Sequence, residues 1–375
     1  MSPAPLAAAA PPLVVRFGAL GDSILLTSLV EALAERWGRP CDLVVGAGSA
    51  GRQVFAGLPS AGEIVALSSR RTPYWLSAEQ RRLVAWLRRR GDGPAWAVES
   101  IGKVLWLLAR GGVGDASLLT ARGLPRGDLE HPVDYYARWA AAVPPAFPAA
   151  GAAAAPEPRR YLPRLHLSDH ERDDVAAWIE RRGWAGRPLV LLQTQSRKRH
   201  RGRWPVERWA AVAGAVLARL PGARLVVIGA PAEAADVAAV AAACGDPRVE
   251  PAAVDLPLRR LFALAAAAHS CISLDTGPAH AAAVLGCPLV VVCGRADPRR
   301  NHPVPCGSPV RVVVSHPPGE WPPTADGFVA WHRVERTGVA PVVAAWEEVA
   351  AIGRGGGGGL AYRAGGRGGD QGAGG

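Results

Sequence analysis

Short apolar runs alternate with segments of helical spacing along the first part of the chain. Residues 13–17 form an apolar run that ends in a glycine turn at 18–21, and residues 24–37 repeat apolar side chains at helical intervals until Gly38. We expect further strands at 41–45 and 63–67. Strands that alternate with helices are typical of a parallel sheet covered by helices. The pattern predicts a Rossmann-like first domain.

The same alternation begins again after a segment that resembles a linker. Residues 141–160 are almost entirely Ala and Pro, a composition that forms no core of its own. Beyond it, we expect helices at 169–182, 206–220, 258–268 and 278–285, and strands at 189–193, 225–228, 271–274 and 289–293. From Gly353 onward glycine dominates. The sequence therefore predicts an N-terminal domain at 1–160, a C-terminal domain at 161–352, and a disordered tail at 353–375.

Composition and charge narrow the class of protein only modestly. A chain of 375 residues is long enough for two α/β domains, and it has no apolar run of membrane-spanning length. The first twelve residues have no basic leader, so we expect a cytoplasmic protein without a signal peptide. The six cysteines form no CxxC pair, which predicts reduced thiols. The net charge of +11 is nearly all arginine in an Ala-, Gly- and Pro-rich chain, so it decides little.

A predicted strand runs directly into a turn and a new helix at residues 273–280. Pro278 suits the first turn of a helix, because its missing N–H would be unpaired there anyway. A helix N-terminus offers backbone N–H groups and a positive dipole end, which favour bound phosphate. Thr276 and Gly277 are therefore candidate diphosphate ligands. The alternative is an ordinary helix cap with a structural Asp275.

A strongly basic loop follows the predicted strand at 189–193. Residues 194–205 carry six side chains that are cationic or become so on protonation, among them Lys198 and Arg203. They leave the carboxyl end of a strand, the edge where open α/β sheets bind ligands. Such a cluster can neutralise a departing diphosphate. The alternative is a solvated charged surface.

The glycine turn after the first strand brings an acid to the start of a helix. Gly18 and Gly21 permit a tight turn and close backbone approach, and Asp22 follows them. The Asp22 carboxylate could take a proton from an attacking hydroxyl. Alternatively, Asp22 is simply an N-cap. The turn does not complete a GxGxxG motif, so a dinucleotide site has weak support.

Two further features each allow two interpretations. Glu233 follows the strand 225–228, where an acid can bond a ribose hydroxyl or favour a helix N-terminus. The segment 74–90 could rest on an anionic bilayer, or it could be a surface helix packed on the core. It mixes five arginines with the apolar side chains Trp75, Leu76, Leu83, Trp86 and Leu87. His166 and His170 have helical spacing but no third ligand, so we expect no metal site.

Taken in this order, the segments resemble glycosyltransferase family 9, the ADP-heptose:lipopolysaccharide heptosyltransferases and their relatives. The resemblance spans roughly residues 13–350 and is carried by residues 16–22, 203–205 with Trp209, 275–280 and 294–298. It implies a B-type glycosyltransferase fold, in which two Rossmann-like domains face a cleft. The N-terminal domain would take the acceptor and the C-terminal domain the nucleotide sugar.

The resemblance also implies roles for particular residues. Asp22 matches the family's proposed base, with Gly18 and Gly21 on the acceptor side. The implied donor-binding residues are Ser196, Lys198, Arg203, Glu233, Asp275, Thr276, Gly277, Pro278 and His280. Transfer would invert the anomeric carbon without a metal or cofactor, from a nucleotide-diphosphate donor that is ADP-linked in this family. The partners would be that donor and a glycan or lipopolysaccharide-type acceptor, with peripheral contact at the inner membrane face and no nucleic acid.

Two departures from the family pattern bear on the substrate. Many members carry lysine two positions before Trp204, where this chain has Gly202, so Lys198, Arg201 or Arg203 must supply that charge. Arg295 and Ala296 replace the usual Pro-Thr, which leaves the donor sugar open. Three alternatives stay in view: a nucleotide-sugar epimerase, a degenerate non-catalytic nucleotide-binding or envelope-assembly protein, and a nucleic-acid binder with steep salt dependence.

Overall fold

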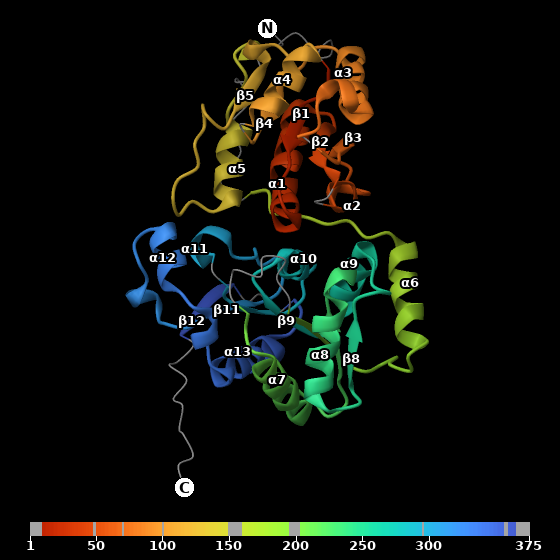
Figure 1. Cartoon of the computed structure of the whole chain (residues 1–375), viewed down its shortest axis with the longest axis vertical. Coiled ribbons are helices and arrows are strands. Elements are labelled where there is room, and N and C mark those ends of the chain that lie inside the picture. The colour runs from red at the N-terminus through yellow and green to blue at the C-terminus, as the bar shows by residue number, and fades with distance from the viewer. Residues whose placement is uncertain are drawn as a thin grey trace. The chain divides into compact units, whose positions relative to one another are not determined.

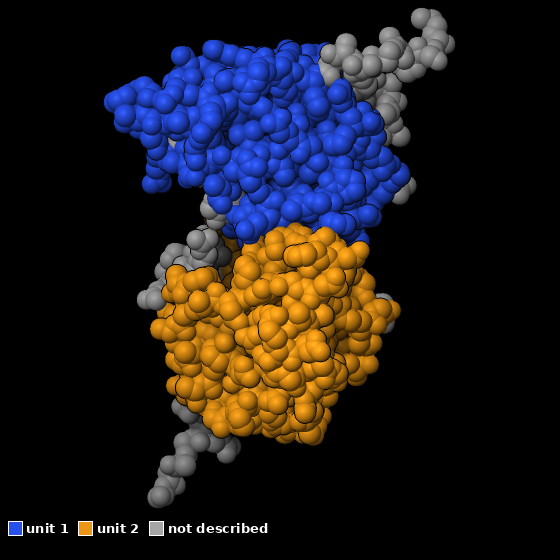
Figure 2. Space-filling model, turned by 90° about the vertical axis from the view of Figure 1, so that its right-hand side faces the viewer, with its two compact units in different colours: residues 1–166 blue, residues 167–375 orange. Residues whose placement is uncertain are grey.

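The computed structural model describes residues 10–47, 50–69, 71–99, 101–148, 160–194, 203–294, 296–355 and 359–364. The chain divides into two compact units, residues 1–166 and 167–375 (Figure 2). Each unit is a parallel sheet accompanied by helices (Figure 1), which confirms the predicted α/β class with two Rossmann-like domains. No helix in the described part of the chain combines the length and the apolar character that a membrane crossing requires.

Unit 1 is a five-stranded sheet in the order β3-β2-β1-β4-β5, with neighbouring strands parallel. This is the strand order of a mononucleotide-binding fold, and it reverses between β1 and β4. The strands are β1 (Leu13–Arg16), β2 (Cys41–Gly46), β3 (Ala61–Leu67), β4 (Ala95–Ala97) and β5 (Leu118–Thr120). The helices are α1 (Leu20–Trp37), α2 (Gly51–Phe55), η3 (Tyr74–Leu76), α3 (Ala78–Arg90), α4 (Gly102–Arg110), η4 (Asp115–Ser117) and α5 (Pro132–Ala141).

The core of unit 1 forms where apolar strand residues meet apolar helix faces. Leu13 and Val15 of β1 pack with Leu83 and Leu87 of α3, and all four are buried. Helix α1 begins four residues earlier than predicted and ends at Gly38, whose φ of 64° is the left-handed value that glycine adopts without strain. The segment 74–90 forms two elements. Helix α3 packs on the core, whereas η3 precedes this helix and is not part of it.

Unit 2 is a seven-stranded sheet in the order β12-β11-β10-β9-β6-β7-β8, again with parallel neighbours. Its order reverses between β6 and β9. The strands are β6 (Leu189–Gln193), β7 (Arg224–Ile228), β8 (Val249–Ala252), β9 (Ser270–Leu274), β10 (Leu289–Val292), β11 (Val310–Val314) and β12 (Leu360–Ala364). The helices are α6 (Asp169–Glu180), α7 (Val206–Arg219), η7 (Pro231–Glu233), α8 (Ala234–Cys244), α9 (Leu258–Ala267), α10 (Gly277–Val284), α11 (Pro298–Asn301), η8 (Pro318–Glu320), α12 (Ala325–Trp331), η9 (Val334–Arg336) and α13 (Val339–Ile352).

The C-terminal tail differs from its prediction. Residues 353–375 were expected to be disordered, yet Leu360–Ala364 forms β12 and pairs in parallel with β11. The prediction is wrong for these five residues because a neighbouring edge strand supplies hydrogen bonds that local composition does not reveal. Most of the predicted linker, residues 149–159, lies outside the described residues, and the domain boundary at 160 stays a prediction.

Candidate functional site

Three charged side chains meet where the strand order of unit 1 reverses. Arg16 ends β1, and its Nη2 lies 3.4 Å from Asp22 Oδ1 at the start of α1. Its Nη1 lies 3.5 Å from Glu99 Oε1, just beyond β4. Burial raises the pKa of the neighbouring Tyr136 to about 12, so this phenol stays neutral. The crevice outside the carboxyl ends at such a reversal is where open α/β sheets bind ligands.

Asp22 is held in place from two sides. Its Oδ2 accepts a hydrogen bond of 2.9 Å from the backbone N–H of Ala19, the N-cap of α1. Its Oδ1 faces Arg16, and the side chain is 36% exposed. The alternative that Asp22 is the N-cap is wrong, because Ala19 is the N-cap and Asp22 is the third residue of α1. One carboxylate oxygen of Asp22 binds the N-cap N–H, and the other faces Arg16.

Gly18 and Gly21 allow this arrangement. A Cβ on Gly18 would lie 2.4 Å from the Asp22 Cβ, closer than side chains ever approach. The φ angle of Gly18 is not left-handed, so its backbone conformation does not require glycine. The close approach of Asp22 is what requires it. Gly21 is buried in the first turn of α1. The structure thus brings these two predicted residues together with Asp22.

In unit 2 a glutamine bridges the strands on either side of the reversal. Gln193 ends β6 and is 4% exposed. Its Oε1 accepts hydrogen bonds from Thr276 Oγ1 at 3.0 Å and from Ser273 Oγ at 3.3 Å. These two residues flank the end of β9, so the start of α10 is tied to the carboxyl end of β6. Gln193 was not among the predicted residues, and its only signal was a polar side chain ending an apolar run.

The N-terminus of α10 has the expected form. Thr276 is its N-cap, Gly277 is its first residue and Pro278 lies in its first turn. The Thr276 hydroxyl donates to Gln193 rather than capping its own helix. Pro278 has no N–H, and the Ala279 N–H donates to the Thr276 carbonyl at 3.1 Å. The Gly277 N–H is therefore the group of this turn that can face an anion, which the helix dipole also favours. His280 is 6% exposed on the same helix.

Asp275 and Asp297 follow the ends of neighbouring strands β9 and β10. Burial raises the pKa of Cys293, which directly follows β10, well above its ordinary value, and the negative charges of Asp275 and Asp297 add to the rise. The Cys293 thiol is therefore neutral and contributes no nucleophile. None of the six cysteines, all in described parts of the chain, forms a disulfide.

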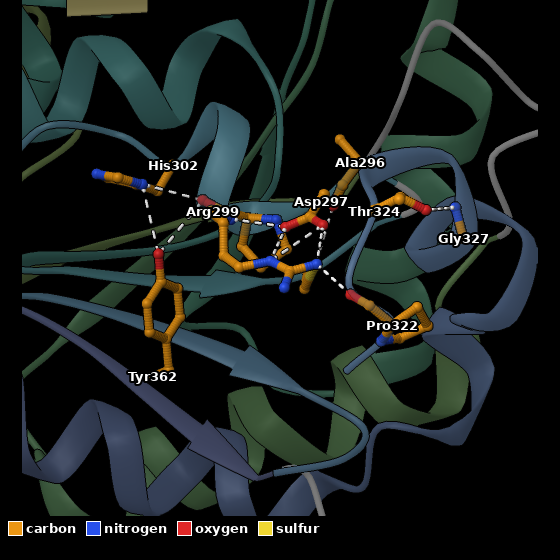
Figure 3. A network of polar contacts seen from close by, with 10 residues as sticks. Ala296, Asp297, Arg299, His302, Pro322, Thr324, Gly327 and Tyr362 are labelled. Atoms are coloured by element: carbon orange, nitrogen blue, oxygen red, sulfur yellow. Dashed lines mark hydrogen bonds and ion pairs between the residues drawn. The ribbon is translucent and has the colours of Figure 1, made fainter. Parts of the chain in front are cut away.

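The loop after β10 is fastened by a buried acid, Asp297, which lies in the 294–298 motif but was given no role from the sequence. Asp297 has a side chain with no exposed surface, caps α11 by accepting from the backbone N–H of Arg299, and pairs with the Arg299 guanidinium at 2.5 Å. Arg299 also donates to the carbonyl of Pro322 (Figure 3). Nearby, the Tyr362 hydroxyl of β12 lies 3.5 Å from His302 Nδ1. This network holds the loop at the carboxyl edge of the sheet.

The remaining predicted donor residues have mixed outcomes. Ser196 and Lys198 lie outside the described residues, as does most of the basic loop. Arg203 forms an ion pair of 3.0 Å with Asp236 of α8. Glu233 accepts a hydrogen bond of 2.9 Å from the Ala230 N–H, which is the helix-terminal arrangement. Contact of Glu233 with a ribose stays a prediction.

A cavity of about 520 Å³ in unit 1 lies apart from these predicted residues. It is lined by α2, β3 and α3, with Arg52, Arg82, Arg89 and Glu79 on its walls, and none of the predicted site residues borders it. Within the described residues, no three His, Cys, Asp or Glu side chains are grouped in a way that could hold a metal ion.

Two Rossmann-like units, each with polar groups at its strand-order reversal, define a protein of the B-type glycosyltransferase fold. The model of glycosyltransferase family 9 (heptosyltransferase) matches residues 139–318. This part of the chain is therefore a glycosyltransferase family 9 domain. The matched range includes residues 203–205, 275–280 and Asp297, but not Asp22. A search of curated protein sequences finds no match.

Solved structures agree with this fold. A family 9 glycosyltransferase from Veillonella parvula aligns with a TM-score of 0.73 and 17% identity, over 91% of this chain and 97% of that one. E. coli ADP-heptose lps heptosyltransferase II aligns with a TM-score of 0.67 and 19% identity, over 91% and 98%. E. coli heptosyltransferase WaaC with ADP aligns with a TM-score of 0.62 and 18% identity, over 90% and 99%.

Proposed function

We propose that this glycosyltransferase is inverting and metal-independent, and that it moves heptose or a related sugar from an ADP-linked donor to a glycan or lipopolysaccharide-type acceptor. The observation that carries the proposal is that each unit places polar groups at its own strand-order reversal. Unit 1 has an acid held by Arg16, and unit 2 has a helix N-terminus suited to a diphosphate. Family membership and the ADP named in one structural relative support the choice of donor.

In this proposal Asp22 is the general base. Its Oδ1 accepts the proton of an acceptor hydroxyl, and the oxygen attacks the anomeric carbon while the bond to the nucleotide diphosphate breaks. A single displacement inverts the configuration at that carbon. Arg16 and the Ala19 N–H fix the carboxylate, so that its orientation is set before the acceptor binds.

The departing diphosphate is stabilised by unit 2. The N-terminus of α10, with Thr276 and Gly277, supplies the Gly277 N–H and the positive end of the helix dipole. The basic loop with Ser196, Lys198 and Arg203 supplies cations for the charge that a divalent metal neutralises in other enzymes. Asp275, Pro278 and His280 complete the proposed donor side, and Glu233 is assigned to the nucleoside.

The experiment that tests this function combines nucleotide binding with turnover. We expect ADP to raise the thermal unfolding temperature more than GDP, UDP, CDP or TDP, because a ligand that binds the folded state stabilises it. We also expect Asp22→Asn to lower kcat by about a hundredfold to ten-thousandfold with ADP binding retained. Asp115→Asn, on an acid in η4, is the matched control.

Other results would favour the alternatives. Product formed from the donor without any acceptor would indicate an epimerase. Donor binding without turnover on a panel of acceptors would indicate a degenerate binding protein. Wild-type turnover by Asp22→Asn would refute the role of Asp22 as base.

A further inference from the structure

Large apolar side chains are exposed on two elements of unit 1, η3 and α4. Trp75 and Leu76 of η3 are 73% and 60% exposed, and Trp106 of α4 is 43% exposed. The fourth side chain of this kind among the described residues, Val254, lies in unit 2. Such grouping of apolar side chains at a surface marks an interaction site, whereas single exposed side chains do not.

Ring contacts join η3, through Tyr74, to α4. The Tyr74 ring meets the Trp106 ring edge-on at 5.4 Å. The Arg110 guanidinium lies 4.8 Å from the Tyr74 ring centre, and Lys103 Nζ lies 4.3 Å from that of Trp106. We call this surface, made of Tyr74, Trp75, Leu76, Lys103, Trp106 and Arg110, the aromatic-basic patch.

The patch is rigidly attached to the unit. Arg81 of α3 donates a hydrogen bond of 2.6 Å to the carbonyl of Trp75, which ties η3 to the helix. Helix α3 lies against α4 (Figure 1) and buries Leu83 and Leu87 in the core. The exposed apolar side chains thus stand on a framework that does not need them for its own packing.

The surroundings of the patch are strongly basic. Segments 71–90 and 101–110 together carry eight basic side chains and one acidic one, Glu79. Glu79 accepts hydrogen bonds from the Ser68 N–H and hydroxyl at 2.8 and 2.9 Å. Arg82, Arg88 and Arg89 are exposed on α3. The patch therefore exposes apolar side chains that are surrounded by positively charged ones.

This chemistry fits an anionic lipid surface better than a nucleic acid. Tryptophan and leucine side chains enter the boundary between headgroups and acyl chains, and surrounding Lys and Arg attract anionic headgroups. Nucleic-acid strands stack on exposed aromatic rings. Leu76 has no ring for a base, and Lys103 and Arg110 already cover the ring of Trp106.

Both elements of the patch follow strands whose carboxyl ends lie at the edge of the sheet that carries Asp22. Helix α4 begins at Gly102, three positions after Glu99, which pairs with Arg16 at the carboxyl edge of β1. Segment η3 follows the carboxyl end of β3 in the same parallel sheet. We propose that the aromatic-basic patch docks this chain on the surface of an anionic bilayer. The purpose that we assign to this docking, which is to bring a glycolipid acceptor to the edge that carries Asp22, rests on the proposed function; the docking itself does not.

Vesicle binding tests the proposal directly. The full chain is sedimented with vesicles of phosphatidylcholine alone and of phosphatidylcholine with phosphatidylglycerol. We expect binding to the anionic vesicles that weakens as salt rises. Lys103→Gln with Arg110→Gln should weaken it about thirtyfold, if each cation contributes as cations near anionic lipid usually do. Trp75→Ser with Leu76→Ser should weaken it at least about tenfold, because these are the side chains that enter the interface.

The controls carry equivalent changes elsewhere. Val254→Ser removes an exposed apolar side chain of unit 2, and Arg181→Gln removes an exposed cation after α6. Both should bind vesicles as the unchanged chain does. All variants should keep their thermal unfolding temperature, because the altered side chains are exposed or lie at the surface.

Three outcomes would overturn the proposal. They are no binding to anionic vesicles, equal loss in the control variants, and patch variants that instead change the oligomeric state or binding to single-stranded RNA. Failure of docking is distinguishable from failure of the proposed function. Transfer to a water-soluble acceptor fragment tests the function without a membrane, and vesicle binding tests the patch without turnover.

Discussion

Gly18 offers a test of Asp22 that leaves the carboxylate chemically unchanged. In Gly18→Ala the new Cβ would stand 2.4 Å from the Asp22 Cβ, whereas ordinary contact begins near 3.4 Å. Asp22 must therefore recede by about 1 Å, and a displacement of that size can lower a rate about a hundredfold. This corresponds to about 2.7 kcal/mol of transition-state stabilisation. We expect kcat to fall by that factor while ADP binding stays unchanged.

The effect on stability should be smaller than the effect on rate. Moving Asp22 weakens its hydrogen bond with the Ala19 N–H, and loss of such a cap costs about 1 kcal/mol. Gly114→Ala is the matched control, since its Cβ would have no neighbour closer than 3.9 Å.

Steady-state kinetics and urea unfolding of these variants test the reasoning. Because Gly18→Ala acts through Asp22, adding it to Asp22→Asn should cause little further loss. Equal kcat values for Gly18→Ala and Gly114→Ala would refute the importance of the position of Asp22. Additive losses in the double variant would show that Gly18 acts by another route.

Three other predictions concern unit 2. Gln193→Leu should weaken ADP binding about tenfold in calorimetry, because it removes the acceptor that places Thr276; unchanged affinity would separate this bridge from the donor site. Arg299→Met should lower the free energy of unfolding by about 3 kcal/mol, because it leaves the fully buried carboxylate of Asp297 without its cation. The loss should be much smaller when Asp297→Asn is already present, and equal losses would argue against the pair. Arg259 holds the pKa of Glu171 down to about 2 through their hydrogen bonds, so the stability from this pair is present above the ordinary pKa of 4.5 and lost as pH falls toward 2. Arg259→Gln should therefore be less stable at neutral pH and approach the unchanged chain near pH 2 in urea unfolding, and a deficit independent of pH would contradict this.

The buried strands were predictable because they are covered on both faces. Strand β10 is apolar throughout, β1 and β6 are apolar up to a polar last residue, and β2 is interrupted only by Asp42. Such nearly continuous apolar runs are typical of strands in a parallel sheet. The three-residue strands β4 and β5 were not predicted, because so short a segment has no detectable period. Their place depends on pairing with β1 and with each other, which is a property of the sheet.

The candidate site was predictable only where its residues are neighbours in sequence. Asp22 follows a glycine turn, and Thr276 precedes a proline at a helix start, so local chemistry marked both. Gln193 is 80 residues from Ser273, and no spacing rule connects them. Their contact arises because β6 and β9 pair in the sheet. Glu99 joins Arg16 for the same reason, through the pairing of β1 with β4.

The two strand-order reversals explain why the proposed chemistry divides between the units. A parallel sheet covered by helices has little room for polar side chains along its strands, so they collect at the carboxyl ends. At a reversal the connections from two adjacent strands run in opposite directions, and the crevice between them stays open to a ligand. Arg16 and Glu99 lie at one such reversal, and Gln193 and Thr276 lie at the other. Changes at the first should therefore act on turnover, and changes at the second on donor affinity. A Gly18 variant that lost ADP binding, or a Gln193 variant that lost turnover alone, would contradict this division.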